Sequence, residues 1–245
     1  MLWPNQLRAL TRLTERHREA ELMDEPSLNV SEHARALMGL RRVNWWSRSA
    51  AMVQPALQRL AVGYSAKRPL RLLDVACGGG DVTAAIARWT RLAGLPVRFS
   101  ACDISPTALD VARHQAVSAG ESIEFFQHDL LQQPLPAEFD VVICSLFLHH
   151  LDEPDAVRVL RSMADAAARA ILVNDLIRSR QGYLLAMFGT RLLSRSRIVH
   201  VDGPLSVAGA FTSQEALRLC EQAGLHGATI SRHWPQRFLL TWRRP

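Results

Sequence analysis

The chain has little of what membrane-spanning, secreted or disulfide-linked proteins need. Its 245 residues contain no apolar run of the roughly 18 residues that a transmembrane helix requires. The N-terminus lacks the basic-then-apolar order of a secretion signal. The four cysteines show no C-x-x-C spacing and are interpreted as small buried thiols. These absences favour a protein of the reducing cytoplasm, with one large α/β domain and appendages.

Lysine is almost absent. Lys67 is the only one, although the net charge is +6 and the pI is near 9.9. An excess of basic residues can reflect affinity for nucleic acid or attraction to anionic lipid. It can also reflect the high arginine content of proteins encoded by a genome rich in G and C. We prefer the last explanation for the average composition, and no nucleic-acid partner is expected.

A glycine-rich turn follows the apolar run at residues 72–75, but it lacks the features of phosphate-binding loops. Of the glycines in the dinucleotide fingerprint G-x-G-x-x-G, only Gly78 is present, because Ala76 and Asp81 occupy the other two places. A P-loop would need a Lys-Ser/Thr pair where Asp81 and Val82 stand. Since a strand, a glycine turn and a helix bring the backbone close to a ligand, a ligand without phosphate is expected.

Acidic residues recur at the ends of the expected strands. The second strand, residues 97–102, ends at Asp103, and the third, residues 122–126, is followed by Asp129. Strands are also expected over residues 140–145, 170–175, 228–232 and 237–242. Strands that alternate with helical patterns predict a mostly parallel sheet, buried on both faces.

The pattern D-x-A-x-G-x-G from Asp74 to Gly80 resembles the first motif of class I S-adenosylmethionine-dependent methyltransferases, although Ala76 replaces the usual glycine. The motif resemblance covers about residues 70–175. It implies a Rossmann-like, seven-stranded, mostly parallel sheet with an antiparallel last strand and helices on both faces. Residues 21–24 and 203–211 are similar to bacterial small-molecule methyltransferases of the ubiquinone or phenolic-lipid type.

This resemblance implies S-adenosyl-L-methionine as the cofactor. The backbone of residues 76–78 would hold its methionine part, Asp103 would accept the ribose hydroxyls, and Asp129 the adenine amino group. Asp103 alone would also suit a dehydrogenase, and Asp129 could be an ordinary loop acid. The full predicted cofactor-binding set is Asp74, Ala76, Cys77, Gly78, Asp103, Ile104, Asp129, Leu130 and Ser145.

A phenolic acceptor gains from losing its proton, for which a histidine is the natural base. His149 and His150 follow the fourth strand, at the edge of the sheet where ligands bind, and we prefer His149. His200 is the third candidate. The alternative is that each histidine bonds a loop carbonyl. No cluster of acids and histidines has metal-ligand spacing, so metal-free chemistry is predicted.

Two segments outside the motifs are expected to cover the site. Residues 1–65 predict an N-terminal helical lid, with helices from Leu7 to the 21–24 stretch, over 31–42 and over 52–60. Residues 66–245 form the expected methyltransferase domain, in which 176–210 is a substrate-side insertion containing a loop at 200–206. The candidates for the acceptor pocket are Asn44, Trp45, Tyr183, Met187 and Phe188, with core packing as the alternative for the aromatic and apolar ones.

The leading functional hypothesis is O-methylation of a hydrophobic phenolic or quinone-like small molecule. The alternatives are C-methylation of a quinone or polyketide precursor, methylation of RNA, and a non-catalytic binding protein. Base methyltransferases commonly carry an N/D-P-P-Y/F motif after the fourth strand, where this chain has Ser-Leu-Phe-Leu at 145–148. Arginines around the apolar stretch 183–188 add the hypothesis of peripheral contact with anionic membranes. The sequence defines neither the acceptor nor an oligomeric state.

Overall fold

The computed structural model describes residues 13–24, 28–137 and 139–245. Its strands form one sheet in the order β3-β2-β1-β4-β5-β7-β6. The first five run parallel, and β7 is antiparallel to both β5 and β6, as expected. The strand bounds are β1 Leu70–Val75, β2 Val97–Asp103, β3 Ile123–Gln127, β4 Phe139–Ser145, β5 Ala167–Leu176, β6 Thr229–His233 and β7 Arg237–Arg243.

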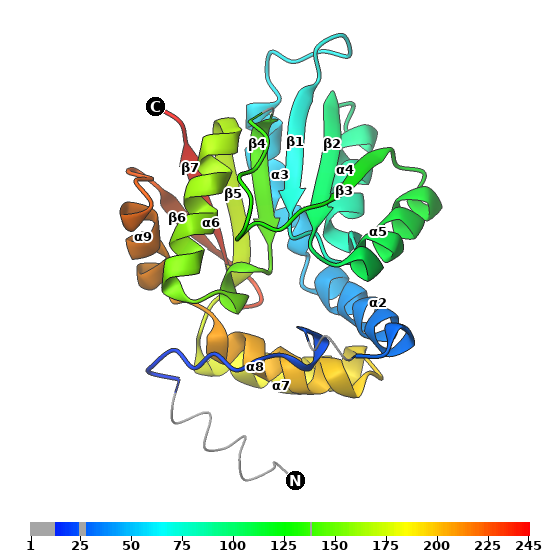
Figure 1. The fold of residues 1–245 in the computed structure, drawn as a ribbon, viewed down its shortest axis with the longest axis vertical. Helices are drawn as coiled ribbons and strands as arrows, with labels where there is room; N and C mark the ends of the chain where they lie inside the picture. The colour runs from blue at the N-terminus through cyan, green and yellow to red at the C-terminus, as the bar shows by residue number, and fades with distance from the viewer. Residues whose placement is uncertain (1–12, 25–27, 138) are drawn as a thin grey trace.

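Helices cover both faces of this sheet (Figure 1). One face carries α3, Ser49–Leu60, and α4, Asp81–Leu92. On the same side, α5, Pro106–Ala119, packs beside α4 against β2 and β3. The opposite face carries α6, Glu153–Ala166, and α9, Ser213–Gln222.

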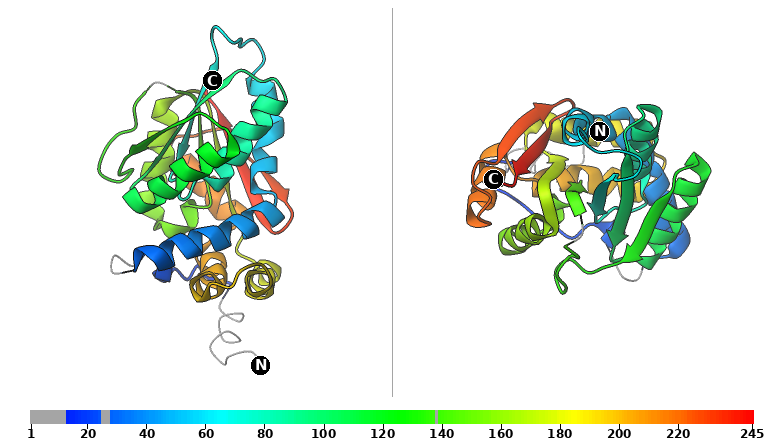
Figure 2. Two further views of the ribbon diagram at one scale, coloured as in Figure 1. Left: turned by 90° about the vertical axis from the view of Figure 1, so that its right-hand side faces the viewer. Right: turned by 90° about the horizontal axis from the view of Figure 1, so that it is seen from above.

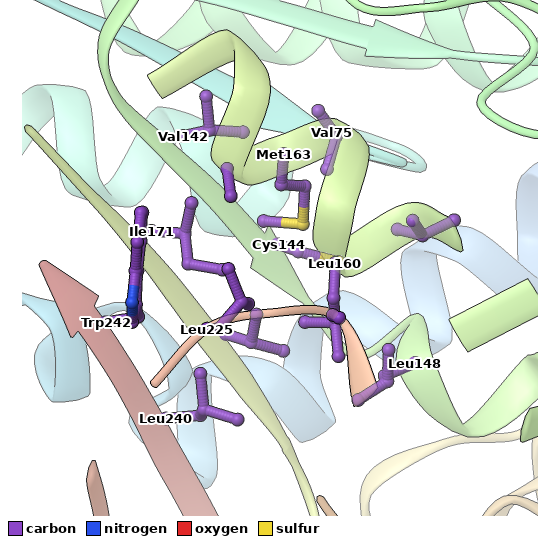
Figure 3. Close-up of a cluster of buried hydrophobic side chains, with 14 of the residues drawn as sticks. Val75, Val142, Cys144, Leu148, Leu160, Met163, Ile171, Leu225, Leu240 and Trp242 are labelled. Carbon is purple, nitrogen blue, oxygen red and sulfur yellow. The ribbon is translucent and has the colours of Figure 1, made fainter. Parts of the chain in front are cut away.

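Strand β1 shows why the strands read as continuous apolar runs. Leu70 and Leu72 pack with the helices α3 and α4, whereas Leu73 and Val75 pack on the side of α6. Successive side chains point to opposite faces, so a strand buried on both faces needs apolar residues throughout. Figure 3 shows the core on the α6 side, where Met163 lies over the strands.

Three further helices lie at the carboxyl ends of the parallel strands: α2 Val30–Trp46, α7 Arg180–Leu193 and α8 Arg197–Gly209 (Figures 1 and 2). They contact one another, and α8 also contacts the short 3₁₀ helices η1, Leu22–Asp24, and η2, Leu148–His150. The predicted lid therefore has α2 over the mouth of the sheet, while α3 joins the layer on its face. None of the helices within the described ranges is long and apolar enough to cross a membrane.

The loop predicted over 200–206 is wrong, because these residues lie inside α8. Pro204 removes one helical hydrogen bond and disfavours helix in the residue before it, which favoured a loop in the sequence. Tertiary contacts outweigh this penalty. Val199 and Val207 are buried, and the Asp202 carboxylate accepts hydrogen bonds from two backbone N–H groups of η1.

The first predicted helix also differs. Its beginning lies outside the described residues, and residues 13–21 form a turn followed by an irregular segment. The backbone N–H of His17 donates to the carbonyl of Ala208 (3.1 Å), and the Arg16 guanidinium donates to three carbonyls of other segments. These hydrogen bonds to distant parts of the chain replace those of a local helix.

Gly80 offers a test of how the glycine turn packs onto α5. Its φ is +73°, and a Cβ there would lie 2.7 Å from the Cβ of Ala112. Gly120 has a similar φ of +70° with nothing within 4 Å of the corresponding position. Gly80→Ala is expected to lower the free energy of unfolding by about 1–3 kcal/mol more than Gly120→Ala, because only the first adds a steric clash to the backbone strain. Urea unfolding followed by circular dichroism measures both, and equal losses would contradict this packing.

Candidate functional site

A cavity of about 750 Å³ lies where the glycine turn, the carboxyl ends of the strands and the three covering helices meet. This volume is in the usual range for small-molecule sites. Every residue of the predicted cofactor set lines the cavity, together with His149 and His150. The structure therefore brings these residues together around one space, from four strand ends and the turns that follow them.

The glycine turn is built from left-handed residues. Ala76 has φ +51°, and Gly78 has φ +54°. The Cys77 N–H donates to the carbonyl of Cys102 (3.0 Å), which fixes the turn against β2. A Cβ on Gly78 would meet no protein atom within 4 Å, so open space lies above this backbone. Ala76 tolerates a conformation that glycine adopts more easily, which explains why glycine is usual in this place.

Asp103 connects the end of β2 to the same turn. One carboxylate oxygen accepts from the Gly78 N–H (2.8 Å) and the other from the Ser105 N–H (2.9 Å). Burial raises the pKa of Asp103, although these hydrogen bonds oppose the shift. Each oxygen keeps a second lone pair, so the carboxylate can still accept two hydroxyl groups from a ligand in the cavity.

Three buried polar atoms that line the cavity have no hydrogen-bond partner within the described part of the chain: Asp74 Oδ1, His128 Nε2 and Ser145 Oγ. Buried polar groups in proteins are nearly always paired. A ligand with an ammonium group, ribose hydroxyls and a purine ring supplies partners of the kinds these atoms need. The donor set thus fits S-adenosylmethionine. His128 was missed in the sequence, although it directly precedes Asp129.

His149 and Asp175 form a buried pair. His149 Nδ1 lies 2.6 Å from Asp175 Oδ1, and the His149 N–H donates to Oδ2 of the same carboxylate (3.1 Å). Burial alone would raise the pKa of Asp175, but the interaction with His149 brings it below its usual range. An ionised carboxylate only accepts, so Nδ1 carries the proton and Nε2 is left to accept one.

Glu21 joins the two histidines from far away in the sequence. Its carboxylate oxygen Oε1 lies 3.8 Å from both His149 Nε2 and His150 Nδ1, and accepts from Ser206 Oγ (2.6 Å). One ligand atom from each of these three residues lies within 4.8 Å of the others. Such a group can hold a cation. The spacing of these three residues in the sequence did not predict that they lie together. Metal-free chemistry therefore stays a prediction.

The predicted acceptor residues are less well placed. Asn44 lines the cavity and donates to Asp81 Oδ2 (3.1 Å), but Trp45 is 80% exposed and lies outside it. Tyr183 and Met187 are buried without lining the cavity, and Phe188 is 60% exposed. The cavity-facing residues of α7 are instead Gly182, Leu185, Ala186, Gly189, Thr190 and Leu193. Because α7 is apolar on several faces, its sequence did not show which one meets the ligand.

His200 is also outside the cavity. Its Nε2 lies 2.7 Å from the backbone oxygen of Ser194, which is the structural role considered as the alternative for each histidine.

Comparisons with known proteins agree with this arrangement. Residues 72–169 match the family model described as a methyltransferase domain. These residues form a methyltransferase domain similar to those of class I, S-adenosylmethionine-dependent enzymes. The ubiquinone biosynthesis O-methyltransferase of Thiobacillus denitrificans is 30% identical over 157 residues, which cover 63% of this chain and 64% of that protein, so the chain spans less than two thirds of this relative. The corresponding Azoarcus protein is 26% identical over 196 residues, covering 76% of this chain and 79% of its own.

Solved structures show the same fold for the methyltransferase domain and its covering helices. A putative O-methyltransferase of Nostoc punctiforme superposes with a TM-score of 0.63 at 17% identity, covering 98% of this chain and 68% of its own. Magnesium protoporphyrin IX methyltransferase of Synechocystis has a TM-score of 0.56 at 15% identity, covering 99% of this chain and 95% of its own.

Asp74 makes the stability of the ligand-free methyltransferase domain depend on pH. Burial raises its pKa to about 7, although Thr83 Oγ1 donates to Oδ2 (2.5 Å). Because the folded state holds this proton more tightly than the unfolded chain, the Asp74 contribution to stability is lost as pH rises from about 4 to about 7. Asp74→Asn is expected to be more stable than the wild type near pH 8, by on the order of a few kcal/mol, with the difference shrinking toward about pH 4.

Urea unfolding at several pH values, without added ligand, measures this difference. Asp110→Asn is the matched control, because Asp110 is an exposed acid on α5. A stability difference between Asp74→Asn and the wild type that does not change with pH would contradict the shift.

Proposed function

We propose that the protein transfers a methyl group from S-adenosylmethionine to a hydroxyl oxygen of a hydrophobic phenolic or quinone-like small molecule. The observation that carries this proposal is the buried His149–Asp175 pair, whose His149 lines the same cavity as the whole predicted cofactor set. The O-methyltransferase names of the relatives at 26–30% identity support the same reaction class.

When bound, the cofactor supplies a methyl group on a positively charged sulfur. The protein's own contribution is to bind, orient and deprotonate. Asp103 would accept the ribose hydroxyls, the backbone at Gly78 would lie against the methionine part, and Asp74 would offer an unpaired carboxylate oxygen to the ammonium group. Holding two reactants in line supplies much of the rate acceleration.

His149 acts as the base in this proposal. Nε2 takes the proton of the acceptor hydroxyl, and the phenolate oxygen becomes the nucleophile. Asp175 stabilises the imidazolium that forms and keeps the ring in one orientation. The Glu21 carboxylate lies 3.8 Å from Nε2, a distance too long for a direct hydrogen bond.

The covering helices give the acceptor side of the cavity an apolar lining. It is formed by Leu28, Leu37, Leu40, Leu185, Leu193 and Val199. Such a surface favours a ring or chain without charge next to the reacting hydroxyl. Product mass spectra with fragmentation separate O-methylation from C-methylation of the same ring.

His149→Gln tests the base. It is expected to lower kcat by about 10²–10⁴-fold on a panel of catechols and alkyl-substituted phenols, because a glutamine amide cannot take up the proton that the imidazole accepts. The affinity for S-adenosylhomocysteine, measured by calorimetry, should stay within about twofold, since the donor residues are separate. Unchanged kcat would contradict the assignment. Loss of wild-type activity with EDTA, restored by a divalent cation, would instead assign Glu21 and the two histidines to a metal.

We also propose that α7 touches anionic membranes while the acceptor enters. Its outward residues Leu184, Phe188 and Leu192 are exposed and follow at helical spacing, with Arg191 beside them. An apolar stripe flanked by cations is typical of helices that lie in the membrane interface. The cytoplasmic location stays part of this proposal, as a peripheral rather than a spanning protein.

Phe188→Asp combined with Leu192→Asp is expected to reduce co-sedimentation with phosphatidylglycerol vesicles by about tenfold. Each change removes an apolar side chain that would enter the membrane interface, and adds a negative charge that the anionic lipid repels. Activity on a water-soluble catechol should not change, because neither residue lines the cavity. Val117→Asp together with Leu92→Asp, two exposed apolar residues elsewhere, is the matched control. Equal sedimentation of all three proteins would exclude the contact.

A further inference from the structure

Arg237, the first residue of β7, is a buried cation for which the described residues supply no hydrogen-bond partner at Nη1. It is 3% exposed and lines the cavity. In the antiparallel β5–β7 ladder it is paired with Leu176. Its Nη1 atom is buried without a hydrogen bond, and within the described ranges its guanidinium makes no ion pair. Burial lowers the pKa of Arg237 to about 10, yet leaves the group charged at neutral pH.

The other buried arginine at this end of the sheet shows what a purely structural role looks like. The guanidinium of Arg178 donates to both carboxylate oxygens of Glu215 (2.7 and 2.8 Å), and to the carbonyls of Ala210 and Leu13. Its charge and its donors are satisfied by the protein. Arg237 has comparable burial and none of these bonds, so its donors remain for something that enters the cavity.

The nearest acids do not supply that partner. Asp175 and Asp81 both act on Arg237 electrostatically, but each is engaged elsewhere. Asp175 accepts from His149, and Asp81 accepts from Asn44. In the described part of the chain, Arg237 therefore forms a salt bridge to neither acid, and it lines the cavity.

The segment before Arg237 holds it in place. The Gln236 carbonyl accepts from the Ile177 N–H (2.9 Å), and the Gln236 side chain bonds both Ser179 and Gln181. Together with the β7 ladder to β5, these bonds fix the backbone that carries the guanidinium. A buried arginine that lines a cavity and whose backbone is held by hydrogen bonds is well placed to bind an anion.

We propose that Arg237 binds a carboxylate group of a ligand in this cavity, a role that rests on the proposed methyl transfer. The planar guanidinium fork matches a carboxylate with two parallel hydrogen bonds. A singly charged group also suits the surroundings better than a phosphate, since Asp81 and Asp175 already bring negative charge close to it. Two ligands could supply the carboxylate: the donor, through its amino-acid end, or a carboxylated phenolic acceptor.

Two matched ligand pairs separate these sources. S-Adenosylhomocysteine carries the amino-acid carboxylate and 5′-methylthioadenosine lacks it; 3,4-dihydroxybenzoate carries a ring carboxylate and catechol lacks it. Each pair is measured on the wild type, Arg237→Met and Arg237→Lys, with Arg243→Met as control, because Arg243 is an exposed residue of the same strand. Calorimetry gives the affinities for the two adenosyl ligands. The two phenolic acceptors are compared by their kcat/KM values.

If the donor supplies the carboxylate, Arg237→Met weakens S-adenosylhomocysteine by about tenfold or more and leaves 5′-methylthioadenosine unchanged. If the acceptor supplies it, the first pair is unaffected, and the preference for 3,4-dihydroxybenzoate over catechol falls by a similar factor. Arg237→Lys should lie between, because it keeps the charge without the fork.

Retained binding of 5′-methylthioadenosine shows that each variant is folded. Equal ratios within both pairs for wild type and Arg237→Met would overturn the inference. A wild type that binds neither adenosyl ligand would overturn the proposed function instead, so the two failures are distinguishable.

Discussion

The hydrogen bond from the Gly78 N–H to Asp103 is the interaction on which the site depends. The glycine turn leaves the regular pattern of β1, and its N–H groups cannot be paired within a strand. Asp103, at the end of the neighbouring strand, satisfies one of them and ties two strand ends into one surface. A buried N–H left unpaired would cost about 1–3 kcal/mol. The same carboxylate therefore shapes the turn and faces the ligand.

The proton-accepting end of the cavity depends on contacts between distant segments. Arg16 donates to the carbonyls of His149, Leu151 and Gly209, and its guanidinium lies 3.7 Å from the ring centroid of Phe211. It thereby fixes the irregular segment that leads to Glu21 against η2 and α8. The segment that leads to Glu21 and the 3₁₀ helix that carries His149 are therefore parts of one packed unit.

What the sequence predicted correctly is local. The order of strands, glycine turn and helices follows from patterns within a few residues, and so do Asp74, Asp103 and Asp129, which all line the cavity. What it missed is set by tertiary contacts. Helix α8 forms despite Pro204. Glu21, near the N-terminus, lies beside His149 and His150, which are more than a hundred residues away in the sequence. Arg237 follows a turn with no motif, and only its lack of partners in the fold makes it informative.

The cavity brings together three acids close to the glycine turn, one of them buried and two half-buried. Burial raises the pKa values of Asp74, Asp81 and Asp103, all close to the glycine turn. Each shift measures a cost that the folded chain carries while the site lacks a partner of opposite charge. A ligand with positive charge and hydroxyl groups relieves this cost, and anything that binds the folded state alone stabilises it. The donor end of the site is therefore expected to gain stability when it is filled, because the positive charge of the donor offsets the cost of keeping these acids ionised.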